Sequence, residues 1–239
     1  MSDADLDAVL DAAGAEQATL VGWSLVGGRV IQYAATHSDR VNSLILINSC
    51  AHSIQEDAYP WGFSRGGLDG VISSLEEAWD TGVDLEITAP SRLADERFRS
   101  WYGRARRASG GPTHLAEAFC LSLEYDVRDL LASISAPTLV LHREGDRLIH
   151  LGAGRYLAEH IPDSKFVVLP GDDHQYFVGD TDALVDEIEE FLTGSRTAAD
   201  SEIVSATILF TNIVASTEHQ ARVGPRGWSR LTAGRRTFR

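Results

Sequence analysis

Ser24 has the sequence surroundings of a nucleophile on a sharp turn. It lies in the run Gly-Trp-Ser-Leu-Val-Gly over residues 22–27, after apolar residues that favour a strand and before residues that favour a helix. A strand-to-helix turn of this kind lifts a serine hydroxyl above a sheet and aims backbone N–H groups at a developing oxyanion. We therefore predict Ser24 as a catalytic nucleophile and the N–H of Leu25 as an oxyanion-hole donor. Because a serine after Gly-x is common by chance, this prediction needs partners elsewhere in the chain.

Asp146 and His174 supply the partners that a serine nucleophile needs. Acyl transfer by serine requires a base within hydrogen-bond reach and an acid that orients the base. Asp146 follows the apolar run 138–142, and His174 follows the apolar run 165–169. Reacting groups gather at the carboxyl ends of strands in an open parallel sheet, and Ser24, Asp146 and His174 each come just after such an end.

Each of these residues also has a simpler interpretation when it is taken alone. His174 would be an exposed loop histidine, Asp146 would be a turn residue, and Glu144 could serve as the acid nearly as well as Asp146. The order and placement of the three residues together favour the catalytic interpretation.

The hydrophobic periodicity predicts alternating helices and strands around these residues. Strands are predicted at 18–23, 41–48, 138–142 and 165–169, and helices at 3–13, 27–37, 152–161 and 182–192. This alternation is typical of βαβ units, so the predicted fold class is α/β, with a parallel sheet flanked by helices.

The segment from about residue 50 to residue 131 interrupts this alternation and is rich in aromatic residues. Because it is too long for a simple loop, we predict an inserted helical cap over the sheet. Most of its aromatic side chains would only pack the cap. We predict, as tentative pocket residues, Trp61 in the cap and Trp23 beside the serine.

Charge and composition narrow the classes of function. The 239 residues carry a net charge of −14, which repels nucleic acid and anionic lipid, so neither is expected as a partner. No run of about 18 or more apolar residues is present, and the acidic N-terminus lacks the apolar core of a signal peptide, so we expect a cytoplasmic protein without membrane spans. Cys50 and Cys120 are expected to be reduced and buried, and no residue spacing suggests a metal or another cofactor.

Four motifs together identify a family resemblance. They are Ala-Ala-Thr-His at 34–37, Tyr-Pro-Trp-Gly at 59–62, Pro-Thr-Leu-Val-Leu-His at 137–142 and Leu-Pro-Gly-Asp-Asp-His at 169–174. With these motifs, residues 3–192 resemble the α/β-hydrolase superfamily, in particular the actinobacterial type in which a hydrolase domain precedes a class III adenylate/guanylate cyclase domain. The resemblance implies that Ser24 is the nucleophile, His174 the base and Asp146 the acid.

Two features differ from the pattern of that family. Val26 replaces a glycine at a close approach of helix and strand, so we expect a strained or shifted turn. We also expect the chain to be truncated at its N-terminus, without further upstream strands and without the loop that gives the second oxyanion donor. Since losing one such donor costs about 10²–10³ in rate, turnover should be weak or absent. The sheet edge beside Leu20 would then be unpaired and apolar, which favours self-association.

The C-terminal segment has a second resemblance. Residues 193–202 are predicted to be a polar linker, and 203–239 are similar to the opening strand of class III cyclases, whose pattern is Phe-Thr-Asp-Ile-Val-x-Ser-Thr. The resemblance implies that the aspartate binds the catalytic metal ions, but Asn212 stands in its place, and a neutral amide is a much poorer ligand. We therefore expect a truncated, vestigial cyclase-like strand without cyclase activity. The basic residues 231–239 no longer follow the pattern. They would suit a tail that binds nucleic acid or a membrane, but we favour the product of a shifted reading frame.

The predicted organisation is a hydrolase-like domain at 1–192, with its cap at about 50–131, followed by the linker and the cyclase-like segment. The predicted function is a serine hydrolase that acts on ester-like or other acyl small molecules and needs no cofactor. The alternative is a non-catalytic ligand-sensing or regulatory module of a former hydrolase–adenylate cyclase signalling protein.

Overall fold

The computed structural model describes residues 3–64, 66–68, 70, 84–109, 119–120, 122–123 and 125–195. The chain divides into two compact units, Met1–Thr197 and Ala198–Arg239. The second unit, with Asn212 and the segment that resembles a cyclase, lies outside the described residues. The cyclase-like interpretation and the predicted domain bounds therefore stay predictions.

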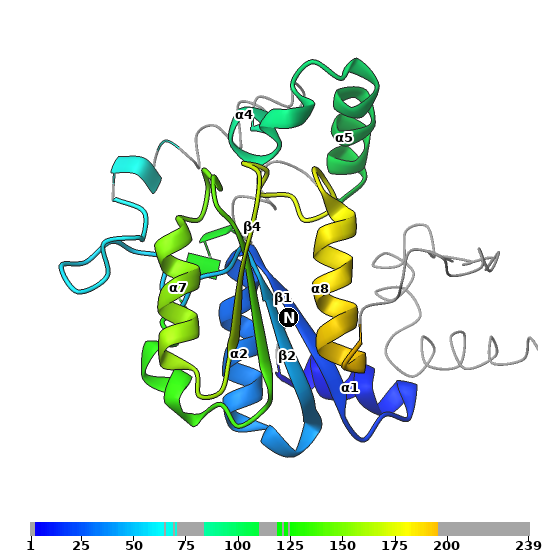
Figure 1. Cartoon of the computed structure of the whole chain (residues 1–239), viewed down its shortest axis with the longest axis vertical. Helices are drawn as coiled ribbons and strands as arrows, with labels where there is room; N and C mark the ends of the chain where they lie inside the picture. Colours follow the sequence, from blue (N-terminus) through cyan, green and yellow to red (C-terminus); the bar gives the residue numbers. More distant parts are fainter. Residues whose placement is uncertain are drawn as a thin grey trace, which may run out of the picture. The chain divides into compact units, whose positions relative to one another are not determined.

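Four parallel strands form the sheet in the order β1-β2-β3-β4. Their bounds are β1 (Ala18–Trp23), β2 (Val41–Ile47), β3 (Thr138–Arg143) and β4 (Lys165–Leu169). Helices lie on both sides of this sheet (Figure 1). The predicted α/β fold with a parallel sheet flanked by helices is confirmed, and the strand ends differ from the predicted ones by no more than one residue.

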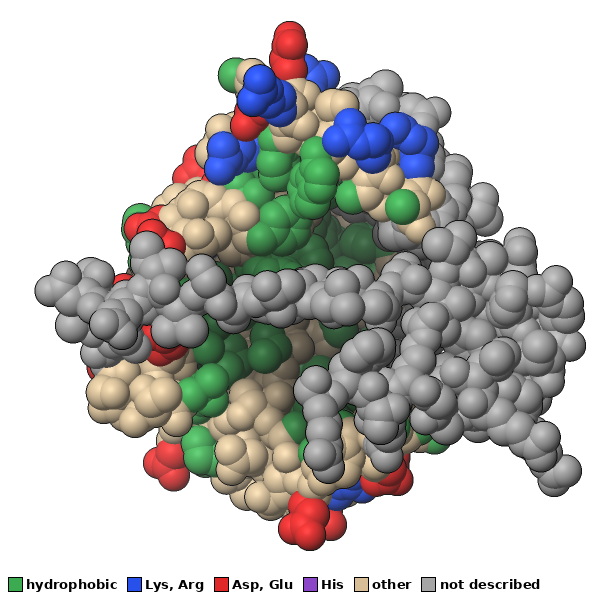
Figure 2. Space-filling view, turned by 90° about the vertical axis from the view of Figure 1, so that its right-hand side faces the viewer, with side chains coloured by type: hydrophobic (Ala, Val, Ile, Leu, Met, Phe, Trp, Pro, Cys, Tyr) green, Lys and Arg blue, Asp and Glu red, His purple; other side chains and the backbone are tan. Residues whose placement is uncertain are grey.

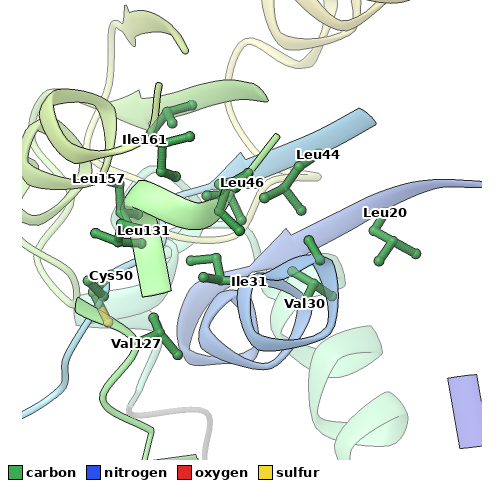
Figure 3. Packing of buried hydrophobic residues seen from close by; sticks show 14 of the residues in the cluster. Leu20, Val30, Ile31, Leu44, Leu46, Cys50, Val127, Leu131, Leu157 and Ile161 are labelled. Carbon is green, nitrogen blue, oxygen red and sulfur yellow. The ribbon is translucent and has the colours of Figure 1, made fainter. Parts of the chain in front are cut away.

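The two faces of the sheet are both apolar and are covered by different helices. On one face, Leu44 and Leu46 of β2 join the larger core with residues of α2 (Gly27–Thr36) and α7 (Leu151–His160). Figure 3 shows these side chains meeting between the sheet and the helices. On the other face, the alternate β2 residues Ile45 and Ile47 pack with α8 (Thr181–Thr193). A strand with both faces buried needs an unbroken apolar run, which is what β2 has.

The first helix, α1 (Asp3–Ala13), is attached to α2 and to the turn after it through its acidic side chains. Arg40 forms ion pairs with Asp7 and Asp11, and the Tyr33 hydroxyl donates to Asp7 at 2.6 Å. Leu10 adds an apolar contact, because it is buried in the larger core. The amphipathic helix predicted at 3–13 is present with those bounds.

The chain between β2 and β3 contributes no strand to the sheet in the described residues. Its described helices are α4 (Leu85–Thr88), the 3-10 turns η3 (Pro90–Arg92) and η4 (Arg128–Ser133), and α5 (Glu96–Ser109). Figure 1 shows α4 and α5 at the end of the sheet where the strands terminate. This position fits the predicted cap, whose covering role stays a prediction.

The two cysteines differ in exposure. Cys50 is buried, and burial raises the pKa of its thiol to about 12. Cys120 is exposed, so the expectation that both thiols are buried is wrong for this residue.

In the residues that the structure describes, no helix is long and apolar enough to cross a membrane.

Strand β1 is at one edge of the four-stranded sheet and pairs with β2. Val21 of β1 is 54% exposed. An exposed edge with apolar side chains offers unpaired backbone groups to another chain. The predicted self-association through this edge therefore stays a prediction with a physical basis.

We expect the protein to self-associate with rising concentration, and a charge on the edge strand to suppress this. The variant Val21→Lys should shift light-scattering masses from a sizing column toward the monomer, because lysine on an edge strand opposes pairing. Val185→Lys is the matched control, since Val185 is 46% exposed on α8, a helix that offers no strand edge. A wild-type protein that stays monomeric at all concentrations would contradict this expectation.

Candidate active site

The backbone at Ser24 makes a sharp corner between strand and helix. Ser24 follows β1 directly and has a φ of 57°, a left-handed conformation that residues other than glycine seldom adopt. The 3-10 turn η1 (Ser24–Val26) leads from there into α2. The N–H of Leu25 lies in this first turn, where backbone N–H groups lack an intrahelical acceptor. Such a corner can present a hydroxyl together with a backbone donor.

Val26 does not strain this corner. Its backbone is ordinary right-handed helix, with φ −66° and ψ −18°, and its side chain is 45% exposed. The expected strain at Val26 is therefore wrong. The close approach lies elsewhere: a Cβ on Gly22 would be 2.8 Å from the Cα of Gly27 and 2.4 Å from Cγ2 of Val30. The glycines that the corner needs are Gly22 and Gly27.

His174 and Asp146 form a buried hydrogen-bonded pair. Nδ1 of His174 donates to Oδ2 of Asp146 at 2.8 Å. The second carboxylate oxygen of Asp146 accepts the backbone N–H groups of Leu148 at 2.8 Å and Ile149 at 3.1 Å. Nε2 of His174 is buried and has no hydrogen-bond partner among the described residues. Nε2 thus keeps its lone pair, as a base requires. Glu144, the other candidate acid, is exposed.

A second buried histidine, His142, lies beside the candidate acid Asp146. His142 is fully buried in β3, and its Nε2 donates to the carbonyl of Ile149 at 2.9 Å. Burial lowers the pKa of His142, so this side chain is held in its neutral form. Its Nε2 also lies 3.9 Å from Oδ2 of Asp146. The contact with Ile149 fixes the turn that carries Asp146.

The carbonyl of His174 accepts two side-chain donors. Nδ2 of Asn48 donates to this carbonyl at 2.9 Å, and Nε1 of Trp23 donates to it at 3.1 Å. Oδ1 of Asn48 in turn accepts the backbone N–H of Arg143 at 2.9 Å. Trp23 also places its ring 5.4 Å from the His174 ring. Trp23, the residue before the candidate nucleophile, is therefore in contact with the candidate base. The predicted role of Trp23 in a pocket stays a prediction.

Ser49 joins the end of β2 to the nucleophile corner. Its hydroxyl donates to the carbonyl of Ser24 at 2.8 Å. A Cβ on Gly27 would lie only 1.7 Å from this hydroxyl oxygen, so the helix can start here only with glycine. The backbone carbonyls of Ser24 and His174 are thus each held by a polar side chain that follows β2, Ser49 and Asn48 respectively.

The helical segment between β2 and β3 holds both neighbours of the candidate base. Gln175 donates its backbone N–H to the carbonyl of Thr88 at 2.9 Å and its side-chain amide to the Tyr102 hydroxyl at 3.0 Å. The carboxylate of Asp173 accepts the backbone N–H of Ser91 at 3.0 Å. The conformation at His174 therefore depends on this segment as well as on the sheet.

A row of partly exposed aromatic side chains leads from the serine corner to α5. The ring of Tyr176 lies between those of Trp23 and Phe177, and Phe177 in turn contacts Trp101 of α5. The centroids of successive rings are 5.3 to 6.0 Å apart. Figure 2 views the side on which α5 and α8 lie in Figure 1, and it shows hydrophobic side chains below a rim of Lys and Arg. An apolar group could be bound along such a row.

Trp61, the other tentative pocket residue, packs in a different aromatic cluster. Its ring lies 5.2 Å from the Tyr59 ring and 5.6 Å from the Tyr156 ring of α7. A Cβ on Gly152 would be 2.0 Å from Nε1 of Trp61, so the indole lies directly on the start of α7. These contacts fit a packing role, and they leave the predicted pocket role of Trp61 as a prediction.

Asn48 and His142 were not predicted from the sequence as part of the site. The available signal was a polar side chain at the carboxyl end of an otherwise apolar strand, where a buried polar group must find a partner. Within the described residues, no cluster of three His, Cys, Asp or Glu side chains could hold a metal ion.

Comparison with known proteins found a matching family model, similar sequences and similar solved structures. A sequence model for the alpha/beta hydrolase fold matches residues 1–180. The chain is 32% identical over 197 residues to the pimeloyl-[acyl-carrier protein] methyl ester esterase of Chromobacterium violaceum, covering 79% of this chain and 76% of that protein. It is 27% identical to a Bacillus subtilis protein named as a member of the AB hydrolase superfamily, covering 78% and 70%. A bromoperoxidase from Bacillus anthracis has the same fold, with a TM-score of 0.70 and 23% identity over 80% of this chain and 72% of that chain.

We expect Gly22, and not Val26, to be the intolerant position of the corner. Gly22→Ala should lower the free energy of unfolding by about 1–3 kcal/mol, because the new methyl group meets backbone that cannot move aside freely. Val26→Ala should change it by less than about 0.5 kcal/mol, as surface substitutions usually do. Chemical denaturation of both variants checks this. Equal effects of the two substitutions would contradict the assignment.

Proposed function

Because the chain belongs to the α/β-hydrolase fold family, we propose that it hydrolyses esters or similar acyl compounds with Ser24 as the nucleophile. The observation that carries this proposal is the 2.8 Å hydrogen bond between His174 and Asp146, next to the left-handed corner at Ser24. The curated relative from Chromobacterium violaceum is named as a methyl ester esterase, which supports an ester as the substrate.

The proposed reaction uses each of these groups in turn. The Ser24 hydroxyl attacks the substrate carbonyl while Nε2 of His174 takes its proton. The oxyanion that forms accepts a hydrogen bond from the backbone N–H of Leu25. His174 then gives the proton to the departing alcohol, which leaves an acyl group on Ser24. Water, deprotonated by His174, hydrolyses that ester and restores the serine.

Asp146 acts on the base and not on the substrate. Its carboxylate holds Nδ1 of His174 in the protonated tautomer and stabilises the imidazolium that forms in each transfer. Two backbone N–H groups fix the carboxylate itself. The aromatic row through Tyr176 and Phe177 supports an acyl or alcohol group with apolar character.

A fluorophosphonate probe tests the nucleophile. We expect covalent labelling of the wild-type protein, because the proposed site supplies Ser24 as the nucleophile and His174 as its base. Ser24→Ala should abolish the adduct. Ser38→Ala is the matched control, since Ser38 is exposed on the turn after α2, and it should label like the wild type. Labelling that persists in Ser24→Ala would remove Ser24 as the nucleophile.

The choice of acid is tested by two amide substitutions. Asp146→Asn should slow labelling and ester hydrolysis by about 10⁴, the loss typical when the acid of a triad becomes an amide and the base takes the wrong tautomer. Glu144→Gln should leave both rates unchanged, because Glu144 is exposed. The reverse result would assign the acid to Glu144.

The non-catalytic alternative makes a different prediction with the same variant. A ligand-sensing module would bind a small acyl compound with an affinity that Ser24→Ala does not change, and it would show no labelling. Calorimetric titration of the wild type and of Ser24→Ala with a slowly hydrolysed ester separates the two proposals.

A further inference from the structure

The loop at residues 170–180 carries His174 without any helix or strand. Such a loop has no regular ladder of backbone hydrogen bonds to fix its shape, yet it holds Nδ1 of His174 2.8 Å from Asp146. Catalysis is sensitive to displacements of about 1 Å, so the loop must be restrained from outside. The restraint at the middle of the loop comes from Asn48 and Trp23, which bind the carbonyl of His174, and from the helical segment between β2 and β3, which binds its two neighbours. The restraint at its ends comes from a residue that has no part in the proposed reaction.

That residue is Arg143, the last residue of β3. Its side chain is among the largest that are fully buried, with 1% exposure. Nη1 donates to the carbonyl of Pro170 at 3.1 Å, where the loop begins. Nη2 donates to the carbonyl of Val178 at 2.5 Å and to that of Asp180 at 3.4 Å, where the loop ends. One guanidinium thus joins both ends of the loop.

Two glycines allow the loop backbone to come this close. Gly171 has a φ of 105° and Gly179 a φ of 77°, a region that favours glycine. A Cβ on Gly171 would lie 3.2 Å from Nη1 of Arg143, and one on Gly179 would lie 2.8 Å from it. The same Cβ on Gly179 would be 2.9 Å from a carboxylate oxygen of Asp173. Both ends of the loop are therefore shaped to fit the guanidinium.

An arginine suits this position because of its shape as well as its charge. A buried cation is costly unless its N–H groups are hydrogen-bonded. Among the described residues, Nη1 and Nη2 of Arg143 donate to carbonyl oxygens, Nε has no partner, and no carboxylate is in ion-pair contact. The planar guanidinium can direct donors to two separate carbonyls at once, whereas a lysine presents a single point charge. The backbone N–H of Arg143 also binds Asn48, whose side chain holds the carbonyl of His174.

We propose that Arg143 is a positioning residue, whose guanidinium holds the two ends of the loop at residues 170–180 and thereby keeps His174 in contact with Asp146. The proposal rests on the proposed function, because the loop carries the candidate base. It also has a consequence that is independent of turnover. Without the guanidinium the loop should open locally, and the hydrogen bond from His174 to Asp146 should break more often.

The first test observes this hydrogen bond directly by NMR of protein with ¹⁵N-labelled histidine. The Nδ1 proton of His174, identified as the signal that His174→Gln lacks, should exchange slowly with water in the wild type. In Arg143→Gln its exchange should be faster by about tenfold or more, because local opening controls exchange. Arg155→Gln is the matched control: Arg155 is exposed on α7, and its loss should leave the exchange unchanged.

The second test separates positioning from substrate binding. If the protein hydrolyses an ester, Arg143→Gln should lower kcat by about 10²-fold with little change in KM, because the loss of Arg143 displaces the base and removes no contact with the substrate. A wild type without activity would count against the proposed function only, since the proton-exchange test needs no turnover.

A variant with a smaller change guards against misfolding. If Arg143→Gln does not fold, by circular dichroism, Arg143→Lys gives the answer, because it keeps the charge but cannot join both ends of the loop. Faster exchange of the His174 proton in either folded variant supports the proposal. Exchange equal to that of the wild type in a folded variant overturns it, because Arg143 would then stabilise the fold without positioning the base.

Discussion

The hydrogen bond between His174 and Asp146 is the interaction on which the rest of the site depends. Both side chains are withdrawn from water, where an unpaired carboxylate or imidazole is costly, and the hydrogen bond satisfies Nδ1 of His174 and one oxygen of Asp146. The pair is made between two segments that are far apart in the sequence. It can persist only if the end of β3 and the loop after β4 are held in fixed relation.

The parallel sheet provides this relation. Adjacent strands lie about 4.8 Å apart, so groups that follow the ends of neighbouring strands come within reach of one another. β1 ends at the serine corner, β2 at Asn48, and β3 just before Asp146. The apolar cores on both faces hold these strands in register. The positions of the polar groups at the strand ends thus depend on the packing of apolar side chains on the two faces of the sheet.

The sequence allowed the main elements and the three candidate catalytic residues to be predicted, for a clear physical reason. Apolar runs mark strands; Ser24 follows β1 directly, and Asp146 and His174 come a few residues after the ends of β3 and β4. The supporting residues could not be predicted in this way. Asn48 contacts Arg143, 95 residues away, and His174, 126 residues away, and no local pattern reveals such pairs. The expectation for Val26 was wrong because the direction in which a helix leaves a turn decides which glycine is crowded.

The bonds from Gln175 and Asp173 to the helical segment between β2 and β3 have an implication for protein engineering. In a modular enzyme, the part that selects the substrate can be exchanged while the reactive groups stay as they are. Here the carbonyl of Thr88, the N–H of Ser91 and the hydroxyl of Tyr102 take part in holding the residues on either side of His174. Under the proposed function, selectivity and reactivity are therefore coupled, and a redesign of that segment has to conserve these three contacts to keep the conformation around His174.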